Sequence, residues 1–321
     1  MNWYLDSLLL ENHQDFMERL ERKKQTLVVS RPLPDFVLEK IKSELSLEWT
    51  YHSNCMEGNT LNLNETRVVL EHGVTVRGKS MREHLEVLNH HEAIDFIASL
   101  IKPDYMLTEK DILDIHGIIM TRIEKDFAGR YRNGGVRIGG ANFIPPNARK
   151  VPDLMESLVY KVSQVSCHWP VLWLATLFHH HFVHIHPFFD GNGRTVRLIM
   201  NVILMNAGYP PAIILQQDRK KYYDALNRAN NGQYDKLFLI MLQAVERSLN
   251  MYLHALPSED GEDEYKAVSD IVAEPAFPYG QEYVSLLARR GLIDAYKDGR
   301  NWVTKRSAVL EYRQKKHLSR H

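Results

Sequence analysis

The spacing of apolar residues predicts a mainly α-helical chain. Apolar positions recur at intervals of three and four residues, which places them on one face of a helix. We expect a first helix over residues 1–25, with its buried side supplied by Leu5, Leu8, Leu9, Phe16, Met17 and Leu20. Further helices are predicted over residues 34–51, within 61–101, from 108 onward, and over 153–165, 170–183, 198–205, 218–234 and 236–255.

Two segments interrupt this helical pattern. Residues 127–152 are rich in glycine and end in Pro145 and Pro146, which indicates turns. Val136, Ile138 and Phe143 within them favour a short β-hairpin, and the plainest alternative is a surface loop. Residues 256–264 are acidic and poor in apolar residues, as linkers are.

Residues 265–321 look like a separate small basic domain. A helix ending at Gly291 precedes two short strands joined at Asp298-Gly299, and a basic helix follows. This order resembles a winged-helix or excisionase-like helix-turn-helix module. Such modules bind DNA or a protein, or dimerise, and the sequence leaves these alternatives open.

Composition limits the partners and the cellular compartment that we expect for the protein. Of 321 residues, 44% are hydrophobic, and 40 Lys plus Arg balance 40 Asp plus Glu, so bulk charge predicts neither nucleic-acid nor membrane binding. The two cysteines, Cys55 and Cys167, fit a reducing compartment. The N-terminus lacks the basic start of a signal peptide, and no apolar run reaches the length of a membrane span. We therefore expect a cytoplasmic protein with no membrane partner.

The chemistry is concentrated in HPFFDGNGRTVR, residues 186–197, between two apolar helices. Gly191 and Gly193 let the backbone approach a ligand closely, and a helix that opens there directs free N–H groups at an anion. Arg194 and Arg197 share one helix face and suit phosphate oxygens. These residues predict a phosphate site.

Two more side chains of this motif predict a reaction. Asp190 would oppose an anion unless Mg²⁺ bridged it to the phosphates. His186, with a reference pKa of about 6.5, can accept a proton from a hydroxyl near neutral pH. Together the parts indicate transfer of a phosphorus group from a Mg²⁺-nucleotide to a hydroxyl.

The run resembles the Fic (Fido) family of protein AMP-transferases, whose motif is HPFx[DE]GNGRxxR, and every defined position matches. The resemblance covers roughly residues 106–245. It implies a Fic-type helical bundle, ATP as substrate, and AMP transfer to a Ser, Thr or Tyr hydroxyl. By resemblance His186 is the base and Asp190 the Mg²⁺ ligand. The nucleotide phosphates are then bound by Gly191, Asn192, Gly193, Arg194 and Arg197, the last at the γ-phosphate.

The resemblance also gives a meaning to Ser53, Glu57 and Gly58. Alone, this segment is a helix end with Gly58 as its cap. Some family members carry an inhibitory motif, [ST]xxxE[GN], which these residues fit. There the glutamate pairs with the second arginine, here Arg197, and occupies the place of the γ-phosphate. The same glutamate supports AMP removal in some relatives.

Other parts of the nucleotide and acceptor sites are implied in the same way. Residues 136–146 correspond to the family's flap, a hairpin edge that holds the target protein, with Ile138 and Gly139 nearest the nucleotide. Tyr222, Tyr223 and Asn230 match positions that close the adenosine pocket. Relatives of this class often form homodimers.

The predicted organisation has four parts: an N-terminal helical region 1–105 with the inhibitory motif 53–58, a Fic core 106–245, a helix end and linker 246–264, and a winged-helix-like domain 265–321. A DNA-binding regulator with a nucleotide-responsive or self-modifying Fic core is the alternative function, and transfer of UMP or phosphate is another. Zinc chemistry at His180 and His184 lacks the HExxH glutamate, so we expect the histidines of this helix to pack or hydrogen-bond around the loop.

Overall fold

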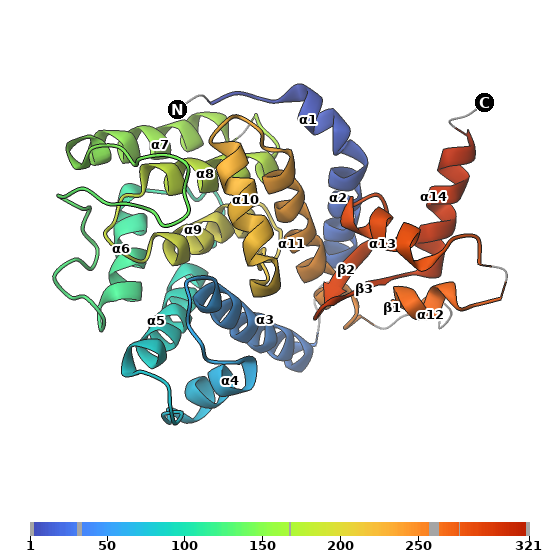
Figure 1. Ribbon diagram of the computed structural model, residues 1–321, viewed down its shortest axis with the longest axis horizontal. Coiled ribbons are helices and arrows are strands. Elements are labelled where there is room, and N and C mark those ends of the chain that lie inside the picture. The colour runs from blue at the N-terminus through green and yellow to red at the C-terminus, as the bar shows by residue number, and fades with distance from the viewer. Residues whose placement is uncertain (1–2, 31–33, 167, 257–262, 276, 319–321) are drawn as a thin grey trace. The chain divides into compact units, whose positions relative to one another are not determined.

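The computed structural model describes residues 3–30, 34–166, 168–256, 263–275 and 277–318, and most of them are helical (Figure 1). The α-helices are α1 Ser7–Asn12, α2 Gln14–Val29, α3 Asp35–Met56, α4 Leu63–His72, α5 Met81–Ala98, α6 Glu109–Met120, α7 Val151–Val165, α8 Val171–Ile185, α9 Asn192–Asn206, α10 Arg219–Ala229, α11 Asp235–Leu253, α12 Val268–Val272, α13 Gln281–Arg289 and α14 Arg306–Leu318. Two short 3₁₀ helices, η1 and η2, cover Ala148–Lys150 and Gln216–Asp218. The strands are β1 Lys266–Ala267, β2 Ala295–Asp298 and β3 Asn301–Thr304.

The helix predicted from residue 108 onward is confirmed, and α5 and α6 both begin with a capping box. Ser80 accepts a hydrogen bond from the Glu83 amide and the Glu83 side chain bonds back, which forms a capping box at the start of α5. Thr108 and Asp111 do the same at the start of α6. These short-range bonds satisfy helix N–H groups that would otherwise lack partners.

The first predicted helix is wrong in detail. It is two helices, because the chain bends at His13 between α1 and α2. Leu5 precedes α1 and is 43% exposed, and Leu8 within α1 is 69% exposed, whereas Leu9, Phe16 and Leu20 are buried as expected.

The chain folds into two compact units. One combines Met1–Leu5 with Glu39–Met241, and the other combines Asp6–Leu38 with Leu242–His321. The boundaries between the units fall within helices α3 and α11. The N-terminal helices α1 and α2 thus belong to the same unit as the C-terminal segment, although residues 39–241 lie between them in the sequence.

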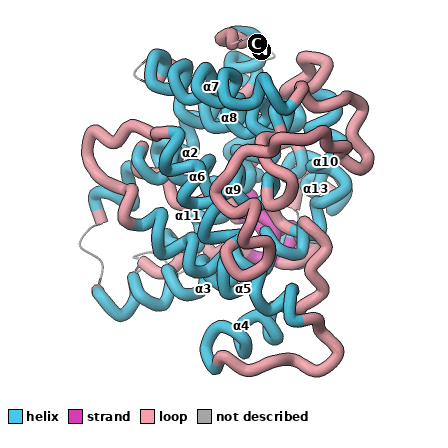
Figure 2. The backbone as a smooth tube through the Cα atoms, turned by 90° about the vertical axis from the view of Figure 1, so that its left-hand side faces the viewer, coloured by secondary structure: helices cyan, strands magenta, loops and turns pink. Residues whose placement is uncertain are grey.

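The first unit is organised around α8 and α9. Every residue of α8 from Leu172 to Phe182 is buried, and α9 contacts α8, α6 and α5. Figure 2 shows α9 enclosed by these helices. The apolar sequence on both sides of the 186–197 motif therefore forms the centre of the bundle, and it holds the loop between these helices rigidly.

The expected β-hairpin in residues 136–146 is wrong. No strand occurs between residues 121 and 147, all of which the structure describes. The polar groups of this segment bond to the side chain and the backbone carbonyl of Asn227 on α10 and to Arg132 instead of to a paired strand. We keep the name flap for residues 136–146.

In the second unit the three strands form an antiparallel sheet in the order β1-β3-β2, and Asp298 pairs with Asn301 at the expected turn. Val268, Val284, Leu287, Ile293 and Val309 are its main apolar core, which packs α12, α13 and α14 on the sheet.

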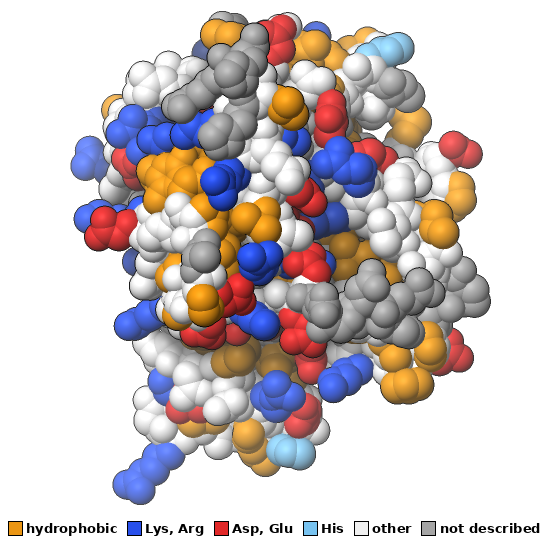
Figure 3. Space-filling model, turned by 90° about the vertical axis from the view of Figure 1, so that its right-hand side faces the viewer, with side chains coloured by type: hydrophobic (Ala, Val, Ile, Leu, Met, Phe, Trp, Pro, Cys, Tyr) orange, Lys and Arg blue, Asp and Glu red, His pale blue; other side chains and the backbone are white. Residues whose placement is uncertain are grey.

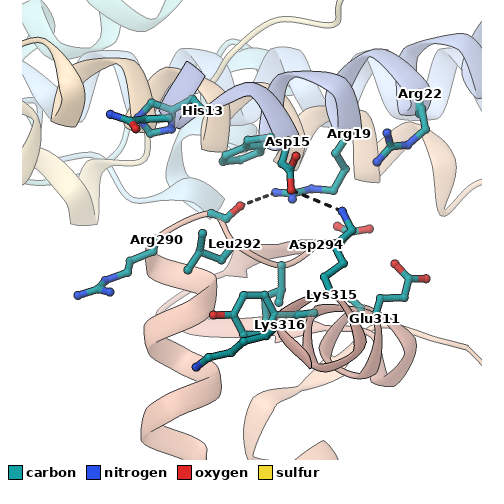
Figure 4. Close-up of a pocket in the computed structure, with 16 residues that line it drawn as sticks. His13, Asp15, Arg19, Arg22, Arg290, Leu292, Asp294, Glu311, Lys315 and Lys316 are labelled. Atoms are coloured by element: carbon teal, nitrogen blue, oxygen red, sulfur yellow. Dashed lines mark hydrogen bonds and ion pairs between the residues drawn. The ribbon is translucent and has the colours of Figure 1, made fainter. Parts of the chain in front are cut away.

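Buried ion pairs fasten α2 to the rest of this unit. Arg19 and Lys23 of α2 both reach Glu246 of α11, at 2.7 Å and 2.9 Å. Arg19 also donates to the Gly291 carbonyl at 3.0 Å. This last bond crosses a pocket of 370 Å³ between α2, the chain after α13, and α14, and Lys315 meets Asp15 at 3.5 Å beside it (Figure 4).

Some expectations concern residues outside the described ones: Cys167, most of the linker at 257–262, and the last three residues of the basic helix. On the face shown in Figure 3, acidic and basic side chains are interspersed rather than gathered by sign. Among the described helices, none combines the length and the apolar composition that crossing a membrane requires.

Candidate functional site

The motif folds as a six-residue loop, 186–191, that links α8 to α9. His186 caps the end of α8 with φ 50° and ψ 63°, a left-handed conformation rare for a residue other than glycine. Gly191 precedes α9 with φ 74°, and a Cβ atom there would lie 3.1 Å from Sδ of Met120. Any other residue at 191 would be strained by this φ, so the turn that aims the start of α9 favours glycine there.

The His186 side chain lies at the rim of the buried loop. Burial lowers its pKa to about 4, against a smaller upward effect of the Val183 carbonyl. The reference value near 6.5 expected from sequence is therefore corrected downward. His186 is neutral at pH 7 and ready to accept a proton.

The start of α9 is an anion site. No side chain caps this end of the helix, because its N-cap residue is Gly191, and the Asn192 side chain exchanges two hydrogen bonds with the Phe188 backbone instead. The first N–H groups of α9 remain available, and the helix dipole adds positive potential there. Arg194 is buried, and its Nε has no hydrogen-bond partner among the described residues. A ligand phosphate would satisfy these donors.

A carboxylate already lies at this place. Arg197 donates from Nη2 to Oε1 of Glu57 at 2.7 Å, and from Nε to the Ser53 hydroxyl at 3.0 Å. A Cβ atom on residue 193 would collide with the same Glu57 oxygen, so Gly193 is what allows the close approach. The structure thus brings together three predicted elements: the second arginine, the second glycine and the glutamate.

Residues of α10 hold the end of α3 in this position. Arg219 donates to the Met56 carbonyl at 2.8 Å, and Tyr223 donates to it at 3.2 Å. Gly58 then turns the chain with φ 105°, a conformation that only glycine adopts readily. The helix-end interpretation and the contact with Arg197 are both realised.

Asp190 is surrounded by arginine. Its Oδ2 lies 2.5 Å from Nη2 of Arg82 on α5, and its Oδ1 lies 3.4 Å from Nη2 of Arg194. Arg82 also approaches Glu86 and Glu124 of the same surface, at 3.5 Å and 3.6 Å. A half-exposed carboxylate next to a phosphate site is a suitable ligand for Mg²⁺, provided that Arg82 moves away to Glu86 or Glu124. Asp190 therefore fits the metal that the sequence predicts.

Two buried side chains that sequence reasoning missed support the loop. Arg132 donates to the His186 carbonyl at 2.8 Å, and also to the carbonyls of Gly134 and Pro146 on either side of the flap. His116 stacks on Phe188 with ring centres 3.5 Å apart and bonds the Asp190 carbonyl at 3.1 Å. Neither residue belongs to a motif, and only their burial reveals them.

The remaining predicted residues lie on the flap and α10. Ile138 is half-buried and Gly139 exposed. Tyr222 is buried with its hydroxyl 2.7 Å from Nε2 of His179, Tyr223 is half-buried, and Asn230 bonds the flap. Whether these three contact adenosine stays a prediction.

Comparison with known proteins agrees with this geometry. Residues 106–204 match the model of the Fic/DOC family. The chain is 39% identical over 245 residues to the protein adenylyltransferase Fic of Culex quinquefasciatus, covering 75% of this chain and 48% of the relative. It is 37% identical to the Nematostella vectensis protein of the same name, covering 75% and 56%. The chain thus spans about half the length of the curated relatives it matches.

A solved structure shows the same fold. Fic-1 (residues 134–508) from C. elegans superposes with a TM-score of 0.71 at 28% identity, over 77% of this chain and 74% of that one. The mainly helical Fic fold that the sequence predicts is therefore confirmed, and the chain also has a small three-stranded antiparallel sheet. Residues 106–204 are thus similar to the Fic/DOC family, and about three quarters of the chain are similar to proteins named protein adenylyltransferase Fic.

Proposed function

We propose that this protein transfers AMP from ATP to a Ser, Thr or Tyr hydroxyl of a protein, and that Glu57 restrains the reaction. The observation that carries the proposal is the anion site at the start of α9, with two buried arginines beside a neutral histidine. Similarity to proteins named protein adenylyltransferase supports the choice of AMP.

In the proposed reaction the acceptor hydroxyl attacks the α-phosphorus of ATP. A bond forms between the acceptor oxygen and that phosphorus, the bond to the β-phosphate bridge breaks, and pyrophosphate leaves. The hydroxyl proton goes to His186, which is neutral at pH 7. The N–H groups of α9 and the guanidinium of Arg194 stabilise charge on the phosphates.

Magnesium would be held by Asp190 together with phosphate oxygens, and it would neutralise charge on the departing pyrophosphate. For this, the Arg82 guanidinium has to leave Oδ2 of Asp190. Arg82 has an alternative within its own surroundings, because Glu86 and Glu124 both lie within 3.6 Å of it.

The restraint follows from competition for one guanidinium. Nη2 of Arg197 donates to Glu57 at 2.7 Å and to the Ser53 carbonyl at 2.8 Å. A phosphate cannot take the same donor while the Glu57 carboxylate remains, and two negative groups at one helix start repel each other. Removal of AMP from a modified protein, with Glu57 taking part, belongs to the same hypothesis.

Transfer of radioactivity from ATP labelled at the α-phosphorus tests the proposal. Wild type, Glu57→Gly and Glu57→Gly/His186→Ala are compared with Mg²⁺ present, with the protein itself and a host lysate as acceptors. We expect strong labelling in Glu57→Gly alone. If no variant labels anything although ATP binds, the proposal of AMP transfer is refuted. Transfer from UTP labelled at the α-phosphorus and from ATP labelled at the γ-phosphate then tests transfer of UMP and of phosphate.

A second proposal concerns the function of the C-terminal residues 265–321. The order of β1, α12, α13, β2, β3 and α14 resembles that of a winged-helix module, and the segment has more Lys and Arg than Asp and Glu. We propose that it binds DNA or a protein that directs the Fic core. A mobility shift of labelled duplex DNA at low salt separates the two, because absence of binding there excludes DNA.

A further inference from the structure

The four histidines of α8 are not used by the proposed chemistry, yet three of them are buried. Two of the four histidines, His180 and His184, converge on one atom, Oδ1 of Asn230, at 2.9 Å and 3.4 Å. Asn230 follows the last residue of α10 and faces the flap. Because both rings contact the same oxygen, they fix the orientation of the Asn230 amide.

The Asn230 amide is hydrogen-bonded to the flap. Nδ2 of Asn230 donates to Oδ1 of Asn142 at 2.9 Å. Asn142 donates in turn from Nδ2 to the Asn227 carbonyl at 3.1 Å, and Nδ2 of Asn227 donates to the Gly140 carbonyl at 3.0 Å. The Asn142 amide N–H and Oδ1 of Asn227 are 3.3 Å apart. Four hydrogen bonds thus clamp residues 140–142 to the end of α10.

The direction of these bonds is fixed from the core. The buried Tyr234 hydroxyl lies 2.9 Å from Nδ1 of His180 and can donate to it. Nε2–H of His180 then donates to Oδ1 of Asn230, which leaves Nδ2 of Asn230 as the donor to the flap. Burial keeps His180 neutral, with its pKa lowered to about 4, so one tautomer serves at neutral pH.

A ring contact works alongside the clamp. Phe143 stacks on His184 with centres 4.4 Å apart and planes 11° from parallel. The two ends of the flap are already bound by Arg132 through Gly134 and Pro146. The clamp therefore determines the conformation of the middle of the flap, which paired strands do not hold.

We propose that Tyr234, His180 and Asn230 form a hydrogen-bond relay that holds the flap through Asn142, and that His180 and Asn142 are positioning residues for the acceptor protein. This inference rests on the proposed function for its consequence, since the flap is the segment expected to bind the acceptor. An extended segment binds a partner through its backbone only when its own backbone is ordered, because disorder adds an entropy cost to binding. The relay supplies that order from α8.

Hydrogen–deuterium exchange of the full chain measures flap order directly and without reference to catalysis. We expect exchange over residues 136–146 to be about tenfold faster in Asn142→Ala and in His180→Phe, as loss of hydrogen bonds of ordinary strength implies. His180→Gln keeps a donor near the position of Nε2, so flap protection should remain close to wild type. Gln233→Ala removes an exposed amide side chain near the clamp that takes no part in these bonds, and it is the matched control.

A second readout concerns the acceptor. In the Glu57→Gly background, Asn142→Ala should lower self-labelling from α-labelled ATP severalfold while ATP affinity stays within twofold. Unchanged flap exchange in both Asn142→Ala and His180→Phe would overturn the relay. Faster exchange in Asn142→Ala alone would show a clamp that does not depend on α8, which also overturns it. If Glu57→Gly itself transfers no label, the proposed function fails while the exchange result still decides the relay.

Discussion

Removing the Glu57 carboxylate should tighten ATP binding by an amount that its contacts set. Glu57 makes one charge-assisted bond to Arg197, at 2.7 Å. Such a bond contributes about 1.5–3 kcal/mol. Because the Glu57 side chain is 30% exposed, water compensates part of its loss, and about 1–2 kcal/mol remains. At about 1.4 kcal/mol per factor of ten, Glu57→Gly should bind ATP about 5–30 times more tightly.

Calorimetric titration with ATP and with ADP, each with Mg²⁺, tests this value. If Glu57 stands where the γ-phosphate binds, ADP affinity should change less than twofold. Glu57→Gln, which keeps the volume and the backbone but removes the charge, should give a smaller increase for ATP. Glu71→Gln on α4 is the surface control. Equal gains for ATP and ADP, or no gain in a folded variant, would refute the competition.

Three further outcomes are expected. Gly191→Ala should lower the free energy of unfolding by about 1–3 kcal/mol in urea titrations, because φ is 74° and Met120 leaves no room; an unchanged midpoint would contradict this. Arg82→Ala should lower the Mn²⁺ concentration for half-saturation of the ATP complex severalfold, since it frees Oδ2 of Asp190, whereas equal titrations would show that Arg82 does not compete with the metal. Thermal stability should fall as pH drops from about 6.5 toward 4. Burial lowers the pKa of His116 and of the α8 histidines, so in this pH range the unfolded chain binds protons that the folded chain does not. A melting temperature that stays constant from pH 7 to 5 would exclude this.

Much of the fold and the central motif could be predicted because their causes are local. Helical spacing of apolar residues, capping boxes such as Ser80–Glu83, and glycines at turns act within a few residues of one another. The anion site at Gly191–Arg194 is likewise a property of one loop and the first turn of one helix. Its sequence could therefore be interpreted without coordinates.

The predictions that failed concern segments whose structure depends on contacts with residues distant in the sequence. Val136, Ile138 and Phe143 have strand-like character, but no second strand is available among the described residues 121–147, and the flap bonds to α10 instead. The first predicted helix begins only at Ser7 and breaks at His13, and Leu5 and Leu8 are exposed. Periodicity gives the phase of one helix and cannot report a break that resets it.

The sequence by itself determined which groups the proposed site contains: a histidine, a carboxylate, two glycines and two arginines in twelve consecutive residues. Only the tertiary structure decided which distant side chains act on it. Arg82 faces Asp190 across 108 positions of sequence, Glu57 meets Arg197 across 140, and Asn142 reaches Asn230 across 88. Such pairs carry no periodic signal, because the packing of separate helices, rather than the spacing along any one of them, brings their atoms together.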